Sequence, residues 1–158
     1  ELLMDDGTLN SASAKVNSYS GSLSSLTHTL QRTTDSMTAG RIYSITFRAQ
    51  NAVGWSPASA VLRVGLGAEP PAITSLQANL AGCGPTFVAL SWSAPVAALQ
   101  LPVLGYVVQM IDPVTDEWID VYDASNDPDA LSYTHFGVIT GESYIFRVFA
   151  VNFNGRSR

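Results

Sequence analysis

Two stretches of this chain share one pattern at a constant spacing of 101 residues, over residues 40–56 and again over 141–157. Each is a run of alternating side chains followed by a turn that contains glycine, and Tyr43 of the first matches Tyr144 of the second. Alternation with a period of two is typical of a β-strand with one buried and one solvated face. A repeat of this length predicts two successive β-domains rather than a short-period solenoid.

The alternation assigns an inward and an outward face to the first of these strands. The predicted inward residues are Tyr43, Ile45, Phe47 and Ala49. The predicted outward residues are Ser44, Thr46, Arg48 and Gln50. No window of eleven residues along the chain shows a helical stripe, so the sequence predicts an all-β fold.

Composition excludes several classes of protein. Of the 158 residues, 46% are apolar and only 13% are charged, so a packed core is expected. The net charge of −5 argues against a nucleic-acid partner, which would need a basic surface. No apolar run approaches the roughly 20 residues of a membrane-spanning helix, so no membrane span is expected in this segment.

Residues that could carry catalysis are few and far apart. His28 and His135 fall on different predicted domains, and Cys83 is the single cysteine, which precludes an intrachain disulfide. A nucleophile and its base must lie within hydrogen-bonding reach, and a phosphate loop or metal site needs a motif that is missing here. We therefore expect no enzyme, no cofactor and no metal.

Acidic residues cluster in one region, where seven of the thirteen carboxylates fall within residues 112–129. Converging carboxylates can bind calcium, and Asp127 and Asp129 would be the nearest candidates. The cluster also fits a solvated strand edge, where charge deters pairing with another sheet. We favour the solvated edge.

The spaced residues of the second repeat resemble the fibronectin type III domain. The resemblance rests on Leu90-Ser-Trp92-Ser-Ala-Pro95, Gly105-Tyr106-Val-Val108, Gly137-Val138-Ile-Thr-Gly141-Glu-Ser-Tyr144 and Ala150-Val-Asn152-Phe-Asn-Gly155-Arg-Ser157. It implies two immunoglobulin-like β-sandwiches arranged end to end, with tyrosine corners at Tyr43 and Tyr144. The core residues it implies are Tyr43, Phe47, Trp92, Tyr106 and Tyr144.

The predicted domains depart from a complete pair. Residues 1–66 would hold strands C to G, residues 67–71 a stiff linker ending in two prolines, and residues 72–158 strands A to F, without the last strand. A sandwich without two strands would expose half of its core. The chain is therefore expected to belong to a longer array, or to receive the strands from a neighbouring chain.

Two surfaces are candidates for contact with another protein. One is an apolar sheet face in the second domain, made by Val107, Ile111, Ile145, Phe149, Val151 and Phe153. A missing strand or a loop could equally cover this face. The other is the loop of Asn154, Gly155 and Arg156, where some fibronectin type III domains are recognised by receptors; an ordinary turn explains the same residues.

These features predict a non-catalytic structural or adhesive module pair, taken from a larger extracellular filament, surface-coat or matrix protein that assembles through sheet faces. Its partners would be neighbouring domains or copies of the same chain. The Ser/Thr-rich stretch 11–38 could carry O-linked glycans if the protein is secreted. The alternatives are a receptor ectodomain or an accessory module of an enzyme, and an intracellular cytoskeletal location stays open.

Overall fold

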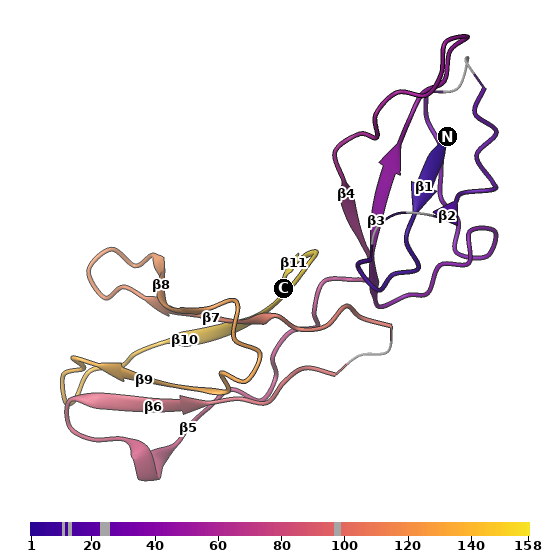
Figure 1. The fold of residues 1–158 in the computed structure, drawn as a ribbon. Helices are drawn as coiled ribbons and strands as arrows, with labels where there is room; N and C mark the ends of the chain where they lie inside the picture. The colour runs from indigo at the N-terminus through magenta and orange to yellow at the C-terminus, as the bar shows by residue number, and fades with distance from the viewer. Residues whose placement is uncertain (11, 13, 23–25, 97–98) are drawn as a thin grey trace. The chain divides into compact units, whose positions relative to one another are not determined.

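The computed structural model describes residues 1–10, 12, 14–22, 26–96 and 99–158. The chain divides into two compact units, Glu1–Ala68 and Glu69–Arg158, which we call unit 1 and unit 2. The described residues form β-strands, turns and one short 3-10 turn, η1 (Leu80–Gly82) (Figure 1). Every pairing between these strands is antiparallel, which confirms the predicted all-β fold.

Unit 1 is built on one four-stranded sheet in the order β2-β1-β3-β4. Its strands are β1 (Leu2–Met4), β2 (Ala14–Lys15), β3 (Arg41–Phe47) and β4 (Leu62–Leu66). The buried cluster on its inner face comprises Met4, Val16, Met37, Tyr43 and Ile45. Because Val16 and Met37 come from the connection between β2 and β3, that connection covers the part of the sheet around Tyr43.

Burial along β3 corrects the predicted faces. Tyr43 and Ile45 are buried, but Phe47 is 61% exposed and Ala49 is exposed as well. Phe47 was expected in the core; it is not, because no other described segment packs over that end of the inner face. On the outward face, Ser44 and Thr46 are buried rather than solvated, since they occupy the centre of the sheet between β1 and β4.

Unit 2 contains two sheets. One has the order β5-β6-β9, with β5 (Gln77–Ala78), β6 (Phe87–Ser91) and β9 (Ser132–Phe136). The other has the order β11-β10-β7-β8, with β7 (Gly105–Ile111), β8 (Trp118–Ala124), β10 (Phe146–Asn152) and β11 (Gly155–Arg156). The short strand β11 was not predicted: the chain turns after β10, and Val151 and Asn152 pair with Arg156 and Gly155.

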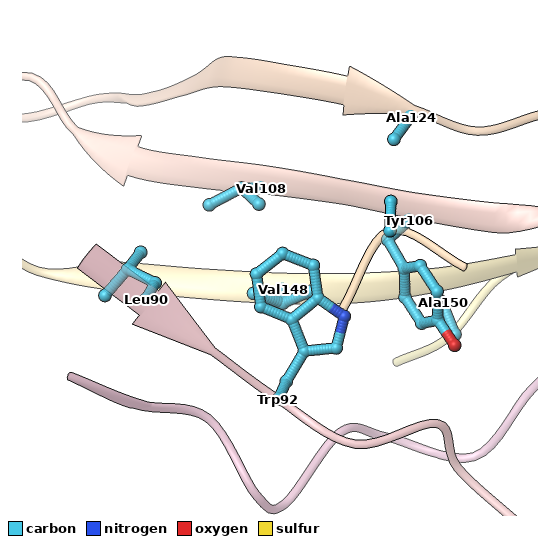
Figure 2. Packing of buried hydrophobic residues seen from close by; sticks show 8 residues of the cluster. Leu90, Trp92, Tyr106, Val108, Ala124, Val148 and Ala150 are labelled. Atoms are coloured by element: carbon cyan, nitrogen blue, oxygen red, sulfur yellow. The ribbon is translucent and has the colours of Figure 1, made fainter. Parts of the chain in front are cut away.

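The core of unit 2 lies between these two sheets (Figure 2). Leu90 and Trp92 come from β6 and the residue just after it, whereas Tyr106, Val108 and Val148 come from β7 and β10. The rings of Trp92 and Tyr106 lie 5.8 Å apart in a tilted arrangement that is favourable for aromatic pairs. Alternation along β7 places Tyr106 and Val108 on this inner face.

The two matched tyrosines make matched hydrogen bonds. The hydroxyl oxygen of Tyr43 accepts a bond from the backbone N–H of Thr38 at 2.6 Å. The hydroxyl oxygen of Tyr144 accepts one from the backbone N–H of Ile139 at 3.0 Å. In both units the partner lies five residues ahead of the tyrosine, so the repeat is one of structure as well as of sequence.

Candidate protein interface

The outer face of the β11-β10-β7-β8 sheet, which we call the outer face of unit 2, carries side chains in rows that cross the strands. The register pairs Arg147 of β10 with Gln109 of β7, and Gln109 with Asp120 of β8. It also pairs Trp118 with Ile111 at the start of β8. Paired residues of antiparallel strands lie on the same side of a sheet, so these side chains meet on the outer face.

Arg147 is the centre of these contacts. Its guanidinium carbon lies 3.9 Å from the centroid of the Trp118 ring and 5.0 Å from that of Phe149. Its Nε donates a hydrogen bond to Oε1 of Gln109 at 2.7 Å, and Nε2 of Gln109 donates to Oδ1 of Asp120 at 2.6 Å. Cation–π stacking and hydrogen bonding together fix the arginine over the sheet. We call the hydrogen-bonded residues Arg147, Gln109 and Asp120, together with Arg156, the arginine ladder.

Burial on the outer face contradicts the prediction for one of the interface residues. Val107 lies opposite Phe149 and is fully buried, so the prediction that it faces a partner is wrong. Phe149, Val151 and Ile111 are half-buried. Ile145 is 56% exposed and Phe153 is 40% exposed, so these two remain accessible at the ends of β10.

Trp118 belongs to this face although the sequence-based face omitted it. It is 36% exposed and stacks on Arg147. Alternation along Trp118-Ile119-Asp120 would have placed Trp118 and Asp120 on one side of β8. The register of β8 against β7 was not available from the sequence, because it depends on the turn over residues 112–117.

The residues of the predicted loop contact, Asn154, Gly155 and Arg156, lie in a turn and a short strand. Asn154 lies in the turn after β10, and its backbone N–H donates to Oδ1 of Asn152 at 2.9 Å. Gly155 and Arg156 form β11 rather than a free loop. Arg156 extends over the sheet, where its Nη2 lies 3.3 Å from Oδ2 of Asp120. It is therefore part of the arginine ladder.

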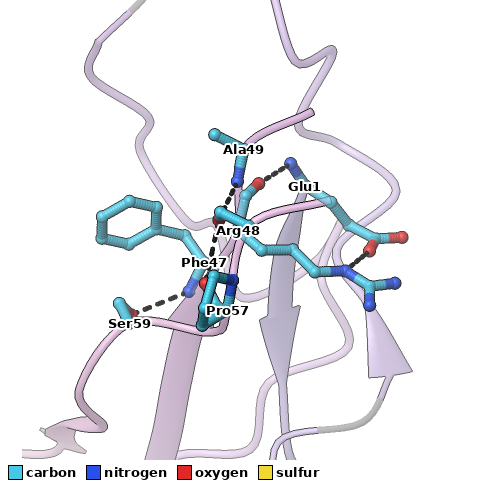
Figure 3. Close-up of polar contacts among 7 residues, drawn as sticks. Glu1, Phe47, Arg48, Ala49, Pro57 and Ser59 are labelled. Carbon is cyan, nitrogen blue, oxygen red and sulfur yellow. Dashed lines mark hydrogen bonds and ion pairs between the residues drawn. The ribbon is translucent and has the colours of Figure 1, made fainter. Parts of the chain in front are cut away.

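Unit 1 also stacks an arginine on an aromatic ring. The guanidinium carbon of Arg48 lies 4.6 Å from the centroid of the Trp55 ring, and its Nε lies 2.6 Å from the Glu1 carboxylate. Figure 3 shows the Phe47 ring on the opposite side of the strand from this guanidinium. At the spacing of the repeat, Ser44, Arg48 and Gln50 of unit 1 stand where unit 2 has Ile145, Phe149 and Val151, so the outward positions of unit 1 are polar where those of unit 2 are apolar.

The acidic residues of unit 2 shape turns and edges. Oδ1 of Asp112 accepts hydrogen bonds from the backbone N–H groups of Val114 and Thr115. Oδ1 of Asp127 likewise accepts from the N–H of Asp129 at 3.1 Å. In such Asx turns the carboxylate oxygen accepts hydrogen bonds from backbone N–H groups of its own turn. Within the described ranges, no group of three or more His, Cys, Asp or Glu side chains could hold a metal ion.

Three residue types of a hydrolase triad meet in unit 1, but in the wrong order. The hydroxyl of Ser18 lies 2.9 Å from Nε2 of His28 and donates a hydrogen bond to the Asp35 carboxylate. A catalytic triad requires the histidine between the nucleophile and the carboxylate. Here the serine occupies the middle position, and its hydrogen is committed to Asp35. The arrangement does not support nucleophilic catalysis.

His135 on β9 makes the stability of unit 2 depend on pH. Burial lowers the pKa of His135 below its usual value of about 6.5. Its ring contacts Phe146 edge-on, and Nδ1 lies 3.2 Å from the Tyr133 hydroxyl. As the pH falls, the imidazole of His135 is therefore protonated to a greater extent in the unfolded chain than in the folded chain. The free energy of unfolding therefore falls as the pH drops from about 7.5 towards the folded pKa.

The measurement is amide hydrogen exchange of β6 and β9 between pH 7.5 and 5, corrected for the intrinsic exchange rate. We expect protection to decrease on acidification in the native chain and to decrease less in His135→Phe, which cannot titrate. His28→Gln, an exposed histidine of unit 1, serves as the control and should keep the full decrease. An identical decrease in His135→Phe would assign the effect to other groups.

The architecture of this chain is similar to that of a solved structure. A crystal structure of domains A168-A170 from titin matches with a TM-score of 0.53 and 21% sequence identity, over 75% of this chain and 37% of that one. The fold is that of tandem fibronectin type III domains. This agrees with the paired tyrosine corners and with the core tryptophan on the inner face of unit 2. No family model matches the sequence.

Two curated proteins are similar to part of this chain. Human myomesin-2 is 38% identical over 72 residues, which is 46% of this chain and 5% of that protein. The cardiac-type myosin-binding protein C of Gallus gallus is 39% identical over 70 residues, 44% of this chain and 5% of that protein. The chain thus spans a small fraction of the length of these relatives. Among its described residues, no helix is long and apolar enough to cross a membrane.

Proposed function

We propose that this fibronectin type III pair is a non-catalytic structural module of a long multidomain protein, and that the outer face of unit 2 binds another protein. The observation that carries the proposal is the exposed apolar side chains beside the arginine ladder, Ile145, Phe153 and Trp118. Aromatic and arginine side chains are enriched at the centres of protein interfaces. Stacking of Arg147 on Trp118 and its hydrogen bond to Gln109 restrict these side chains before binding, which lowers the entropy cost of binding.

The relatives support a location in muscle. One is named as a cardiac-type myosin-binding protein and another as a myomesin. We therefore propose the intracellular option that the sequence left open, in place of an extracellular filament or matrix. O-glycans on residues 11–38 gain no support from these relatives, and residues 11, 13 and 23–25 of that stretch lie outside the described residues.

Co-sedimentation with purified striated-muscle thick filaments tests both parts of this proposal. We expect the native chain to pellet with the filaments and Ile145→Asp to bind at least tenfold more weakly, because a carboxylate must then be desolvated in the contact. Ile139→Asp is the matched control, since Ile139 is 67% exposed but lies in a loop outside the face. Equal loss in both variants would exclude the outer face, and no binding of the native chain would exclude the muscle partner.

A further inference from the structure

The strand β9 lies at the edge of the β5-β6-β9 sheet in unit 2. Among the described strands it pairs with β6 alone, beside which it lies in Figure 1. A strand in this position has one row of backbone N–H and C=O groups without a neighbouring strand. Such a row is a template for pairing with a further strand.

Hydrogen bonds at the two ends of β9 show which of its backbone groups point away from β6. The N–H of Trp92 donates to the carbonyl of Leu131 at 3.1 Å, and the N–H of Gly137 donates to the carbonyl of Thr86 at 2.9 Å. Residues that bond to the neighbour and residues that point away from it alternate along an antiparallel strand. The backbone groups that point away from β6 therefore belong to Ser132, Thr134 and Phe136. We call these groups the free edge.

The free edge has none of the features that protect edge strands from pairing. Charged side chains and proline are the usual protection, and β9 contains no Asp, Glu, Lys, Arg or Pro. The other described edge strands of three or more residues are β4 and β8. The strand β4 contains Arg63, and β8 contains Asp120 and Asp123. Among these three strands, β9 is thus the one whose edge carries no fixed charge.

Two copies of β9 are complementary when they run antiparallel about a two-fold axis at Thr134. In that register Thr134 lies opposite Thr134 of the second copy, and Phe136 lies opposite Ser132 of the second copy. Each N–H of one free edge then faces a carbonyl of the other. Phe136 is 70% exposed, so its ring can cover the small serine side chain at both ends of the pairing.

The Phe136 ring is already positioned by a neighbour. Phe136 pairs with Phe87 across β9 and β6, and the centroids of the two rings lie 5.8 Å apart. A ring held in this way loses little freedom on binding. Exposed aromatic side chains are also enriched at protein interfaces.

We propose that β9 joins two copies of this chain, so that their β5-β6-β9 sheets become one continuous antiparallel sheet. A second copy is favoured over a different protein because an identical strand matches the free edge in this register and brings no charge to it. A strand of five residues makes a small contact, so the dimer is weak and reversible. The free edge belongs to a different sheet from the outer face of unit 2, so this proposal and the proposed function can fail separately.

Sedimentation velocity of residues 1–158 tests the dimer. We expect the average mass to rise from monomer towards dimer as the concentration increases up to about 1 mM. Thr134→Lys and Thr134→Glu each place two like charges opposite each other at the two-fold axis, so each variant alone should dimerise at least tenfold more weakly. An equimolar mixture of the two variants should recover the dimer, because lysine then lies opposite glutamate.

Gln77→Lys and Gln77→Glu are the matched controls, since Gln77 is an exposed residue of β5 at the opposite edge of the same sheet. Both should dimerise as the native chain does. A native chain that stays monomeric throughout this range would overturn the proposal. A dimer that neither Thr134 variant weakens, or that the mixture does not recover, would also overturn it.

Hydrogen exchange of the native chain gives a second test that needs no substitution. The amides of Ser132, Thr134 and Phe136 should exchange at least threefold more slowly at high than at low protein concentration, because pairing protects them. Amides elsewhere in unit 2 should keep their rates. Protection that instead appears on β8 would assign the dimer to the other edge and would contradict the proposal.

Discussion

Trp92→Ala is expected to destabilise unit 2 by about 3–5 kcal/mol, the usual cost of removing a buried tryptophan. The indole is 6% exposed and packs between the two sheets against Tyr106 and Val148. Its removal leaves a cavity that β-strands on both sides cannot close without shifting the sheets. Since small domains have total stabilities of 5–15 kcal/mol, this loss should bring unit 2 close to unfolding at 37 °C.

Calorimetry and hydrogen exchange of β6 and β7 measure the effect. Trp55→Ala provides the same chemical change at an exposed position, because Trp55 is 46% exposed and contacts Arg48 by its face. That variant should lose only about 0.5–1 kcal/mol, the value of an exposed cation–π contact. A loss in Trp92→Ala no larger than in Trp55→Ala would contradict the sandwich core described for unit 2.

Gly105→Ala is expected to destabilise unit 2 by on the order of 3 kcal/mol, at the upper end for overpacking. A Cβ at this position would lie 1.9 Å from the carbonyl oxygen of Ala124 and 2.5 Å from the carbonyl carbon of Ser125. Both are backbone atoms, so β8 must separate from β7 to make room. We expect the variant to lose exchange protection along both strands.

Gly84→Ala is the matched control for this prediction. There the new Cβ would lie 2.5 Å from the end of the Phe87 ring, a side chain that can rotate away. The cost should be smaller by at least about 1 kcal/mol, because a rotamer change is less costly than moving a strand. Equal unfolding midpoints for the two variants in urea would show that β7 and β8 are not held as closely as described.

Alternation along the chain indicated which face of the sheet each side chain occupies. It did not indicate whether residues from elsewhere in the chain cover that face. Tyr106 and Val108 are inward on β7 and buried, as their period requires. Phe47 is also inward by its period, yet it is exposed, since cover must come from residues distant in sequence. Val107 is outward by the same period and still fully buried, at a position between Phe149 of β10 and Asp123 of β8 that a single strand does not reveal.

The candidate interface was predictable only in part for the same reason. Ile145 and Phe153 are exposed, and both could be assigned from the alternation of a single strand. The arginine ladder depends on the register between four strands. The contact of Arg147 with Trp118 joins residues 29 positions apart, and no local pattern specifies it.

The register shift between Val108 and Gln109, where β7 meets β8, matters most for a polypeptide with many similar domains in series. Neighbours on such a chain meet at high effective concentration, and an open, flat edge strand would allow one domain to exchange strands with the next during synthesis. An irregular pairing of this kind increases the local twist of a strand, and the exposed Asp123 on β8 places a negative charge that would repel an identical edge. The β8 edge of unit 2 is therefore poorly suited to pairing with an identical edge.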